Sequence, residues 1–356
     1  MHLLADISAH GFGHLSQTAP VLDALRALTP GLRLTVRSAI AHEVLAARIG
    51  GAFEHIAQAR DFGFVMRNAI AIDYAASAER YRAFHADWDR TVAAEADDLR
   101  ARGVDALLAN AAYLPLAGAA QASIPCAGMC SLNWADLFKH YFAAQPWAPA
   151  IHAQMLAAYN AAGGFLRVTP GMPMADFANR REIGPIARIG RRDRAGVAAG
   201  FGIEAGERWV LVAMGGMEFR LPVERWPQLP GVAWLVPAAW QAQRADVRAF
   251  DSFGTHFTDL LANVDAVITK PGYGTFAEAA CNGVPVLYVE RDDWPEERYL
   301  ADWLVQHGRA GTVTRAQLMS GDVLAALEAV WRMAPPPVPA PTGAADAAAW
   351  LAQHVC

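Results

Sequence analysis

Short apolar runs alternate with helix-like stretches along most of the chain. The apolar stretch at the N-terminus, which Asp6 and Ser8 interrupt, predicts a buried parallel strand that leads directly into a glycine-rich turn at 10–14. In the first half, the pattern predicts further strands at residues 32–37, 106–109 and 127–130, and helices at 21–28, 41–49, 86–102 and 114–121. This alternation is typical of a parallel sheet with helices on both faces.

The alternation weakens at residues 184–206, where Gly, Pro and several Arg follow one another without a clear period. We therefore expect a domain boundary there. A second series predicts strands at 209–214, 232–236, 265–269 and 284–289. A proline-rich segment then leads to a short helix at 344–354, which we expect to pack back on the first domain. The predicted domains are residues 1–183 together with 340–356, and residues 184–339.

Composition narrows the class of protein. The 356 residues are 54% hydrophobic and 18% charged, a globular composition that suffices for two cores. The net charge is −5 and no run of Lys or Arg exists, which excludes binding along a nucleic acid. The first residues resemble neither a signal peptide nor a membrane span. The four cysteines show neither zinc spacing nor a disulfide framework, so we expect a cytoplasmic protein with reduced thiols. We expect it to be a monomer or a homodimer.

A strand, a tight turn and a helix follow one another in the second half. The apolar strand ends at Lys270, and Pro271, Gly272 and Gly274 form the turn. The helix is expected to begin near Thr275 and to end before Gly283, a good C-cap. Backbone N–H groups at such a helix start have no acceptor within the helix, and the helix dipole adds positive charge there.

This turn can hold a diphosphate. Thr275 adds a hydroxyl donor, and Glu278, one turn further, can accept hydrogen bonds from ribose hydroxyls. Strand–turn–helix joins without a ligand occur in every α/β fold, so the spacing alone leaves the phosphate site a hypothesis. The next strand ends in a polar cluster at residues 290–299, at the edge of the sheet where α/β folds bind ligands.

The turn after the first strand reads His-Gly-Phe-Gly-His, from His10 to His14. Glycines let the backbone turn sharply and approach a ligand. His14 is expected at the start of a helix, where the dipole disfavours its cationic form, so a neutral His14 can act as a base. The alternative reading is a histidine that caps the helix or packs against the second domain.

Two other segments of the first half carry polar groups at strand ends or in loops. Asp61 lies in a loop with two phenylalanines, and Asn133 and Asp136 follow the strand at 127–130. We consider these residues and His10 as acceptor contacts. Packing between domains is the alternative, and it is the preferred reading for Trp134.

The second half resembles the donor domain of GT-B glycosyltransferases. The run Gly272-Tyr273-Gly274-Thr275, a Glu at 278, Val-Pro at 284–285, Arg-Asp at 291–292 and Glu-Glu at 296–297 carry the likeness. It is similar to the lipid-II-forming N-acetylglucosaminyltransferase group and, more closely, to the glycosyltransferase-like N-terminal region of plant L-arabinokinases. The likeness covers most of the chain. It implies the GT-B fold, two doubly wound Rossmann-like domains facing across a cleft.

The resemblance also implies residue roles. Thr275 and the turn N–H groups bind the donor diphosphate, Glu278 binds the ribose, and residues 296–298 face the sugar. Residues 215–216 form a glycine turn near the diphosphate, and 257–260 contact the base. The donor-site residues are Gly13, Gly215, Gly216, Phe257, Gly272, Tyr273, Gly274, Thr275, Glu278, Glu296, Glu297 and Arg298. Related enzymes place a Gly-x-Gly-His turn where His14 stands, which makes His14 the expected catalytic base.

These features predict a nucleotide-sugar-dependent glycosyltransferase. We expect the transfer to be inverting, with His14 as the base. We expect it to need no metal, because adjacent Asp292 and Asp293 point in different directions and no Asp-x-Asp pair suits a metal. No cofactor beyond the nucleoside diphosphate sugar is expected. The acceptor, a small molecule, a lipid-linked group or a protein, is not specified by the sequence. A nucleotide-sugar hydrolase or epimerase, or a non-enzymatic nucleotide-sugar-binding protein, are the alternatives.

Overall fold

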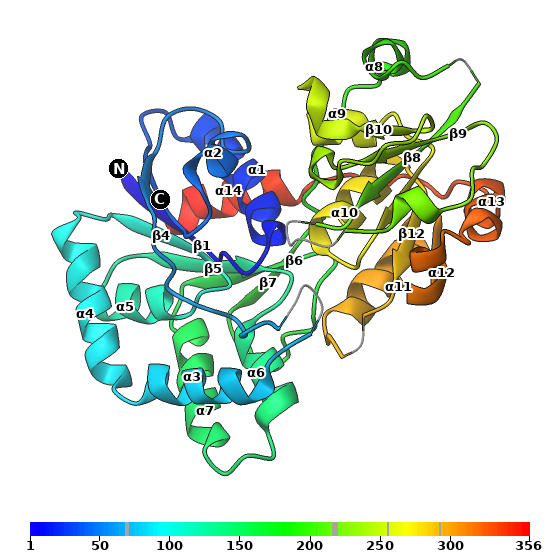
Figure 1. Ribbon diagram of the computed structural model, residues 1–356. Helices are drawn as coiled ribbons and strands as arrows, with labels where there is room; N and C mark the ends of the chain where they lie inside the picture. Colours follow the sequence, from blue (N-terminus) through cyan, green and yellow to red (C-terminus); the bar gives the residue numbers. More distant parts are fainter. Residues whose placement is uncertain (68–70, 205, 216–219, 255, 292) are drawn as a thin grey trace. The chain divides into compact units, whose positions relative to one another are not determined.

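The computed structural model describes residues 1–67, 71–204, 206–215, 220–254, 256–291 and 293–356. The chain divides into two compact units, which are described separately (Figure 1). Unit 1 comprises Met1–Ile186 and Thr342–Cys356, and unit 2 comprises Ala187–Pro341. None of the helices in the described ranges is long and apolar enough to cross a membrane.

Unit 1 is built on a seven-stranded parallel sheet in the order β3-β2-β1-β4-β5-β6-β7. Its strands are β1 (His2–Ile7), β2 (Arg33–Arg37), β3 (Glu54–Ile56), β4 (Ala106–Asn110), β5 (Cys126–Cys130), β6 (Gly164–Val168) and β7 (Arg180–Ile183). Its helices are α1 (Phe12–Leu28), α2 (His42–Ala46), α3 (Tyr74–His85), α4 (Trp88–Ala101), α5 (Leu114–Ala122), α6 (Trp134–Phe142), α7 (Ala148–Asn160) and α14 (Gly343–His354). Every residue of β1, β4 and β5 is buried, as expected of central strands covered on both faces.

The last helix, α14, packs against α1 within unit 1, and Figure 1 shows the two side by side. Glycines permit α14 to approach the start of β6 and the end of β7 closely. A Cβ at Gly343 would lie 2.1 Å from the carbonyl oxygen of Gly184, and one at Gly164 would lie 2.6 Å from the Trp350 ring. The backbone N–H of Gly184 also donates to the Asp346 carboxylate at 3.1 Å. The C-terminal segment is therefore an integral part of unit 1.

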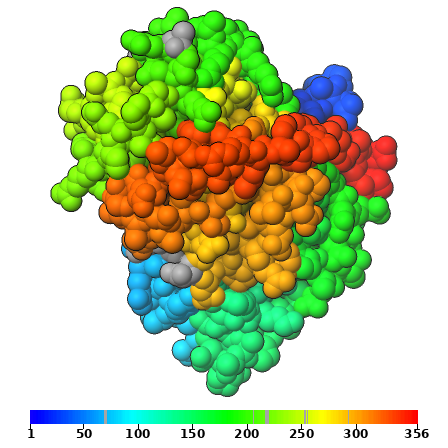
Figure 2. Space-filling view, turned by 90° about the vertical axis from the view of Figure 1, so that its right-hand side faces the viewer, coloured from blue at the N-terminus to red at the C-terminus, as the bar shows by residue number. Residues whose placement is uncertain are grey.

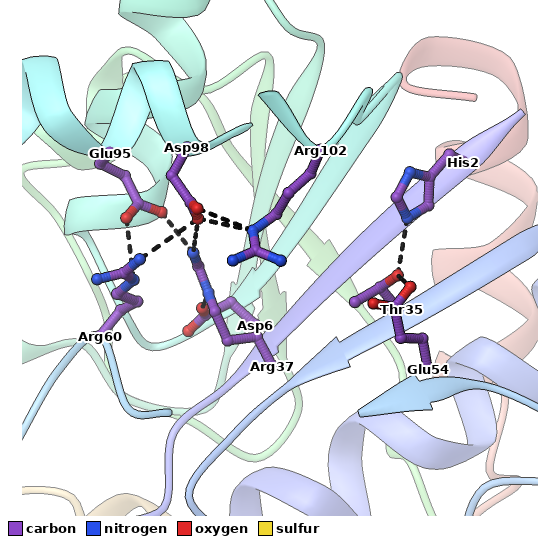
Figure 3. Close-up of polar contacts among 9 residues, drawn as sticks. All are labelled: His2, Asp6, Thr35, Arg37, Glu54, Arg60, Glu95, Asp98 and Arg102. Carbon is purple, nitrogen blue, oxygen red and sulfur yellow. Dashed lines mark hydrogen bonds and ion pairs between the residues drawn. The ribbon is translucent and has the colours of Figure 1, made fainter. Parts of the chain in front are cut away.

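A buried ion cluster joins β1, β2 and α4 of unit 1 (Figure 3). Arg37, at the end of β2, has no exposed surface. Its guanidinium contacts Asp6 at 2.5 Å, Asp98 at 3.4 Å and Glu95. Arg60 lies 3.0 Å from Glu95. Burial raises the pKa of Asp6 to about 6 although the Arg37 charge opposes the shift.

Unit 2 has a six-stranded parallel sheet in the order β10-β9-β8-β11-β12-β13. Its strands are β8 (Arg208–Ala213), β9 (Val232–Val236), β10 (Val247–Ala249), β11 (Ala266–Thr269), β12 (Val286–Val289) and β13 (Ala310–Val313). Its helices are α8 (Arg194–Phe201), α9 (Phe257–Leu261), α10 (Tyr273–Asn282), α11 (Glu297–His307), α12 (Arg315–Ser320) and α13 (Leu324–Arg332), with 3₁₀ turns η1 (Val223–Arg225), η2 (Ala238–Trp240) and η3 (Phe250–Phe253). The two separate sheets confirm the predicted fold class.

The proline-rich segment after α13 runs along the outside of unit 2, where Figure 2 shows it as an extended band. It lies against the end of α10, since a Cβ at Gly283 would be 3.4 Å from the Val338 side chain. Proline fixes φ and lacks an N–H donor, so such a segment stays extended without joining the sheet. It is therefore an extended surface linker between α13 and α14.

Helix α10 runs from Tyr273 to Asn282 with Gly283 as its C-cap, which confirms a helix that begins near Thr275 and ends before Gly283. The expectation that His14 lies at the start of a helix is also confirmed, but the hydrophobic pattern placed that helix at residue 21, whereas α1 begins at Phe12. The stretch 184–206, predicted to lack a clear period, contains helix α8, which begins after Asp193, whose side chain accepts from the Gly196 N–H. The starts of α1 and α8 are polar or glycine-rich, so hydrophobic periodicity does not mark them.

Candidate functional site

The turn of unit 2 that was predicted to bind phosphate lies at the point where the strand order of the sheet reverses. β8 and β11 are neighbours, and successive strands leave them in opposite directions. The Gly215 turn follows β8, and the Gly272 turn follows β11. Ligands of open α/β sheets bind outside the carboxyl ends of strands at such a point. Both predicted glycine turns are therefore at the edge where a ligand is expected.

The N-terminus of α10 is open to an anion. Gly272 is the N-cap, in an extended conformation, and no side chain caps the helix. The first intrahelical bond runs from the Phe276 N–H to the Gly272 carbonyl at 3.2 Å. The N–H groups of Gly274 and Thr275 precede it and have no intrahelical acceptor. Their direction and the helix dipole suit a phosphate.

Thr275 and Glu278 lie three residues apart on α10, so they share one face of the helix. Thr275 is partly exposed in the first turn, and Glu278 is 5% exposed. The far end of the helix is fixed by Asn282, whose amide donates to the Glu278 carbonyl at 2.7 Å and to the Arg188 carbonyl at 2.9 Å. A rigid helix thus carries the residues predicted to bind diphosphate and ribose.

Lys270 is a charged residue of this edge that the sequence analysis treated only as a strand end. It follows β11 directly and is partly buried. A Cβ at Gly215 would lie 2.9 Å from the Cε atom of Lys270, so the lysine stem passes under the β8 turn. Burial and then the Arg291 charge lower the pKa of Lys270 to about 8. In the sequence, the position of this lysine between an apolar strand and a Pro-Gly turn could have identified it as a candidate site residue.

The polar segment after β12 is ordered by its own side chains. Glu297 accepts from the Arg291 N–H at 3.1 Å, and Glu296 accepts from Trp294 Nε1 at 3.2 Å. The Arg291 guanidinium lies 4.8 Å from the Trp294 ring centre. The two glutamates predicted to face the sugar therefore also shape the loop that presents them.

The remaining donor-site residues are more scattered. Arg298 lies over the Tyr299 ring at 4.8 Å. Phe257 begins α9 and has its ring 6.3 Å from that of Phe250. Tyr273, the first residue of α10, is buried. Gly216, and Asp292 of the adjacent Asp pair, lie outside the described residues.

Unit 1 carries a second polar group at its own reversal point, between β1 and β4. His14, in the first turn of α1, is 6% exposed, and its Nδ1 lies 2.7 Å from the Asn110 Oδ1 at the end of β4. Among the described residues, a Cβ at Gly11 or Gly13 would meet no atom within 4 Å, so the turn backbone is open on that side. Asn110, the last residue of an otherwise apolar strand, was not predicted.

The hydrogen-bond pattern fixes the tautomer of His14. Asn110 Nδ2 donates to Thr18 Oγ1 at 2.9 Å, and that hydroxyl donates to the His14 carbonyl at 2.8 Å. The Asn110 oxygen therefore faces His14 and accepts a hydrogen bond from the Nδ1–H group. Burial lowers the pKa of His14 to about 4 against the effect of this hydrogen bond. The imidazole is consequently neutral, with its lone pair on Nε2.

Asp61 and His10 lie beside His14 around the buried Trp134. The Trp134 Nε1 donates to Asp61 at 2.7 Å, and its ring lies 5.2 Å from that of His10 and 5.8 Å from that of His14. Burial, and then the charge of Asp6, raise the pKa of Asp61 to about 7. Trp134 has no exposed surface and packs among residues of unit 1. The structure thus brings together three of the predicted unit 1 residues.

Asn133 and Asp136 lie at the start of α6. The Asn133 side chain accepts from the Asp136 N–H at 2.8 Å, so Asn133 is the N-cap of that helix. Asp136 is partly buried, which raises its pKa. In the described part of the chain, no three His, Cys, Asp or Glu residues are grouped so that they could hold a metal.

The comparisons with known proteins agree with this architecture. No protein-family model matches the chain. Over 319 residues, 88% of this chain, it is 23% identical to the L-arabinokinase of Arabidopsis thaliana, of which the match spans 30%. The resemblance to the lipid-II-forming group stays a prediction.

Solved glycosyltransferases share the fold over nearly their whole length. The glycosyltransferase of kitacinnamycin aligns with 100% of this chain and 99% of its own, at 16% identity and a TM-score of 0.62. VinC, solved with dTDP, aligns with 100% and 95%, at 17% identity and a TM-score of 0.59. UGT2 of Phytolacca americana, solved with UDP-2-fluoroglucose and pterostilbene, aligns with 99% and 94%, at 11% identity and a TM-score of 0.57. The chain therefore has the two-domain fold of the GT-B glycosyltransferases.

Proposed function

We propose that this protein is a nucleotide-sugar-dependent glycosyltransferase. The observation that carries the proposal is the open N-terminus of α10, with Thr275 in its first turn, at the carboxyl ends of β8 and β11. Two structural relatives were solved with a nucleoside diphosphate or a nucleotide-sugar analogue, which supports the same ligand class here. The neutral His14, held by Asn110 at the reversal point of unit 1, supplies a base.

The proposed reaction is an inverting transfer that needs no metal. His14 Nε2 takes the proton of the acceptor hydroxyl while its oxygen bonds to the anomeric carbon. The bond from that carbon to the β-phosphate oxygen breaks, and its electron pair stays on the diphosphate. The α10 N–H groups and the Thr275 hydroxyl stabilise the charge that develops there. Asn110 holds the tautomer that leaves Nε2 unprotonated.

A thermal-shift screen of nucleoside diphosphates tests the binding half of this proposal. A ligand that binds only the folded state raises the free energy of unfolding, by about 2.7 kcal/mol when its concentration is a hundred times its dissociation constant. The unfolding temperature rises accordingly. At least one of UDP, dTDP, GDP and ADP should stabilise the protein. Incubation with the matching nucleotide sugars alone then separates a transferase from a hydrolase, which would release free sugar without an acceptor. A protein that none of the four stabilises would contradict the proposal.

Substitution of the α10 residues should weaken nucleotide binding. Thr275→Val and Glu278→Ala each remove one hydrogen-bonding group, and we expect a loss of about 1.5–3 kcal/mol, roughly ten- to a hundredfold in affinity. Calorimetry with the best nucleoside diphosphate measures it. Thr275→Ser, which keeps the hydroxyl, is the matched control and should bind within about threefold of wild type. Unchanged affinity in both Thr275→Val and Glu278→Ala would move the donor site elsewhere.

A further inference from the structure

Lysine is rare in this chain, and one of its lysines stands at the candidate donor site. Of the 30 Lys and Arg residues, only Lys139 and Lys270 are lysines. Lys139 is exposed on α6 and pairs with Asp176 at 3.2 Å. The Lys270 carbonyl accepts from the Thr269 hydroxyl at 3.1 Å, whereas its ammonium has no hydrogen bond or ion pair to any residue that the structure describes. Apart from Lys139, every other basic residue of the Lys and Arg type in the chain is an arginine, so a compact ammonium at the candidate donor site is an exception.

The surroundings of Lys270 are positive. Its stem lies within van der Waals reach of the Gly215 turn, and it directly precedes the turn at the start of α10. The Arg291 charge acts on it from the segment after β12, in the same direction as burial. Three adjacent strand ends, of β8, β11 and β12, therefore bring a partly buried cation, a second cation and a helix N-terminus to one edge. Positive groups so placed are stabilised by an anion.

We propose that Lys270 is a catalytic residue that binds the β-phosphate of the donor and stabilises the departing diphosphate. This inference rests on the proposed function. When the bond between the anomeric carbon and the β-phosphate oxygen breaks, the electron pair remains on that oxygen, and the Lys270 ammonium donates a charge-assisted hydrogen bond to it. Lys270 keeps its proton, and the acceptor proton goes to the base. The glycine at 215 leaves room for the lysine stem, since a Cβ there would lie 2.9 Å from Cε.

Calorimetry with inorganic pyrophosphate, UDP and dTDP tests this role. Lys270→Met keeps the apolar stem and removes the charge, and should lower affinity for all three by roughly ten- to a hundredfold. Lys139→Met is the matched control and should bind as wild type does. Lys270→Arg, which restores a cation, should recover part of the loss. Lys270→Met with wild-type affinity for all three probes would overturn the inference.

Amine labelling gives an independent readout on the wild-type protein, without any substitution. With its pKa near 8, the Lys270 amine should be acetylated readily at pH 8, and pyrophosphate or a bound nucleoside diphosphate should protect it. Lys139 reports the general reactivity of the reagent. Equal labelling of Lys270 with and without a bound nucleotide would refute the contact while leaving the proposed function intact. Protection by pyrophosphate without binding of any nucleotide would support the contact between Lys270 and a diphosphate, and would refute the proposal that the donor is a nucleotide sugar.

Discussion

Replacement of His14 by Ala should lower turnover about 100- to 10,000-fold, the range that a positioned base contributes. Affinity for the nucleoside diphosphate should barely change, because His14 lies in unit 1 and the phosphate turn in unit 2. His14→Gln, which keeps a polar side chain in the buried site, should lose turnover to the same extent. Steady-state kinetics and calorimetry on the same preparations measure both quantities.

His10→Ala is the internal control, because the His10 ring contacts the same Trp134 ring as His14 does. It should matter less than His14→Ala, since His10 precedes the turn and lies edge-on to the tryptophan. If His14→Ala lost nucleotide affinity and turnover in equal measure, His14 would be a donor ligand and not the base. Thermal unfolding of each variant shows whether the substituted protein is still folded.

The pH dependence of turnover separates His14 from Asp61. Burial lowers the pKa of His14 to about 4, so a His14 base is unprotonated, and active, throughout the neutral range, and kcat/KM declines only towards pH 4. Asp61 has a pKa raised to about 7, so an Asp61 base would lose activity as the pH falls through 7. Asp61→Asn removes this carboxyl, so it should lose turnover about 100- to 10,000-fold only if Asp61 is the base. A wild-type decline near pH 7 together with that loss would assign the base to Asp61.

The strand, turn and helix of the candidate donor site were predictable because they are local in sequence. A strand, a glycine turn and a helix fix the positions of Gly272, Thr275 and Glu278 within a few residues of one another. Lys270 was missed because its proximity to Gly215 arises only when β8 and β11 pair in the sheet. Edge strands such as β7, with three of its four residues exposed, were missed because they carry no apolar run.

The His14 site was only half predictable for a related reason. Its partner Asn110 lies 96 residues away, and the two meet because β1 and β4 are neighbours in the sheet. The start of α1 buries Gln17 and Thr18, which hydrogen-bond to other buried side chains. Polar residues inside a helix face break the hydrophobic pattern, so the pattern placed the helix nine residues too late, at 21 instead of Phe12. Buried polar networks are invisible to periodicity for this reason.

Arg37→Met should be the most destabilising single change in unit 1. The guanidinium is fully buried against Asp6, Glu95 and Asp98 (Figure 3). Its removal leaves Asp6 buried without its ion-pair partner, while Glu95 and Asp98 keep Arg60. Loss of one member of a buried ion pair costs about 3–5 kcal/mol. Urea unfolding followed by hydrogen exchange of peptides from β1 and β2 reports this loss for unit 1 separately from unit 2.

The loss should depend on pH with a defined sign. In the wild type, burial already raises the pKa of Asp6 to about 6, and without Arg37 it rises further. A carboxyl whose folded pKa exceeds its unfolded value binds its proton more tightly when folded, so the variant is least destabilised at low pH and loses more stability as the pH rises. The matched control lies on the same strand: Arg33 pairs with Glu54 at 3.2 Å, both exposed, and Arg33→Met should cost about 0–1 kcal/mol. Equal losses in the two variants would show that the cluster contributes little to stability. A loss independent of pH would show that the pKa of Asp6 does not change when Arg37 is removed.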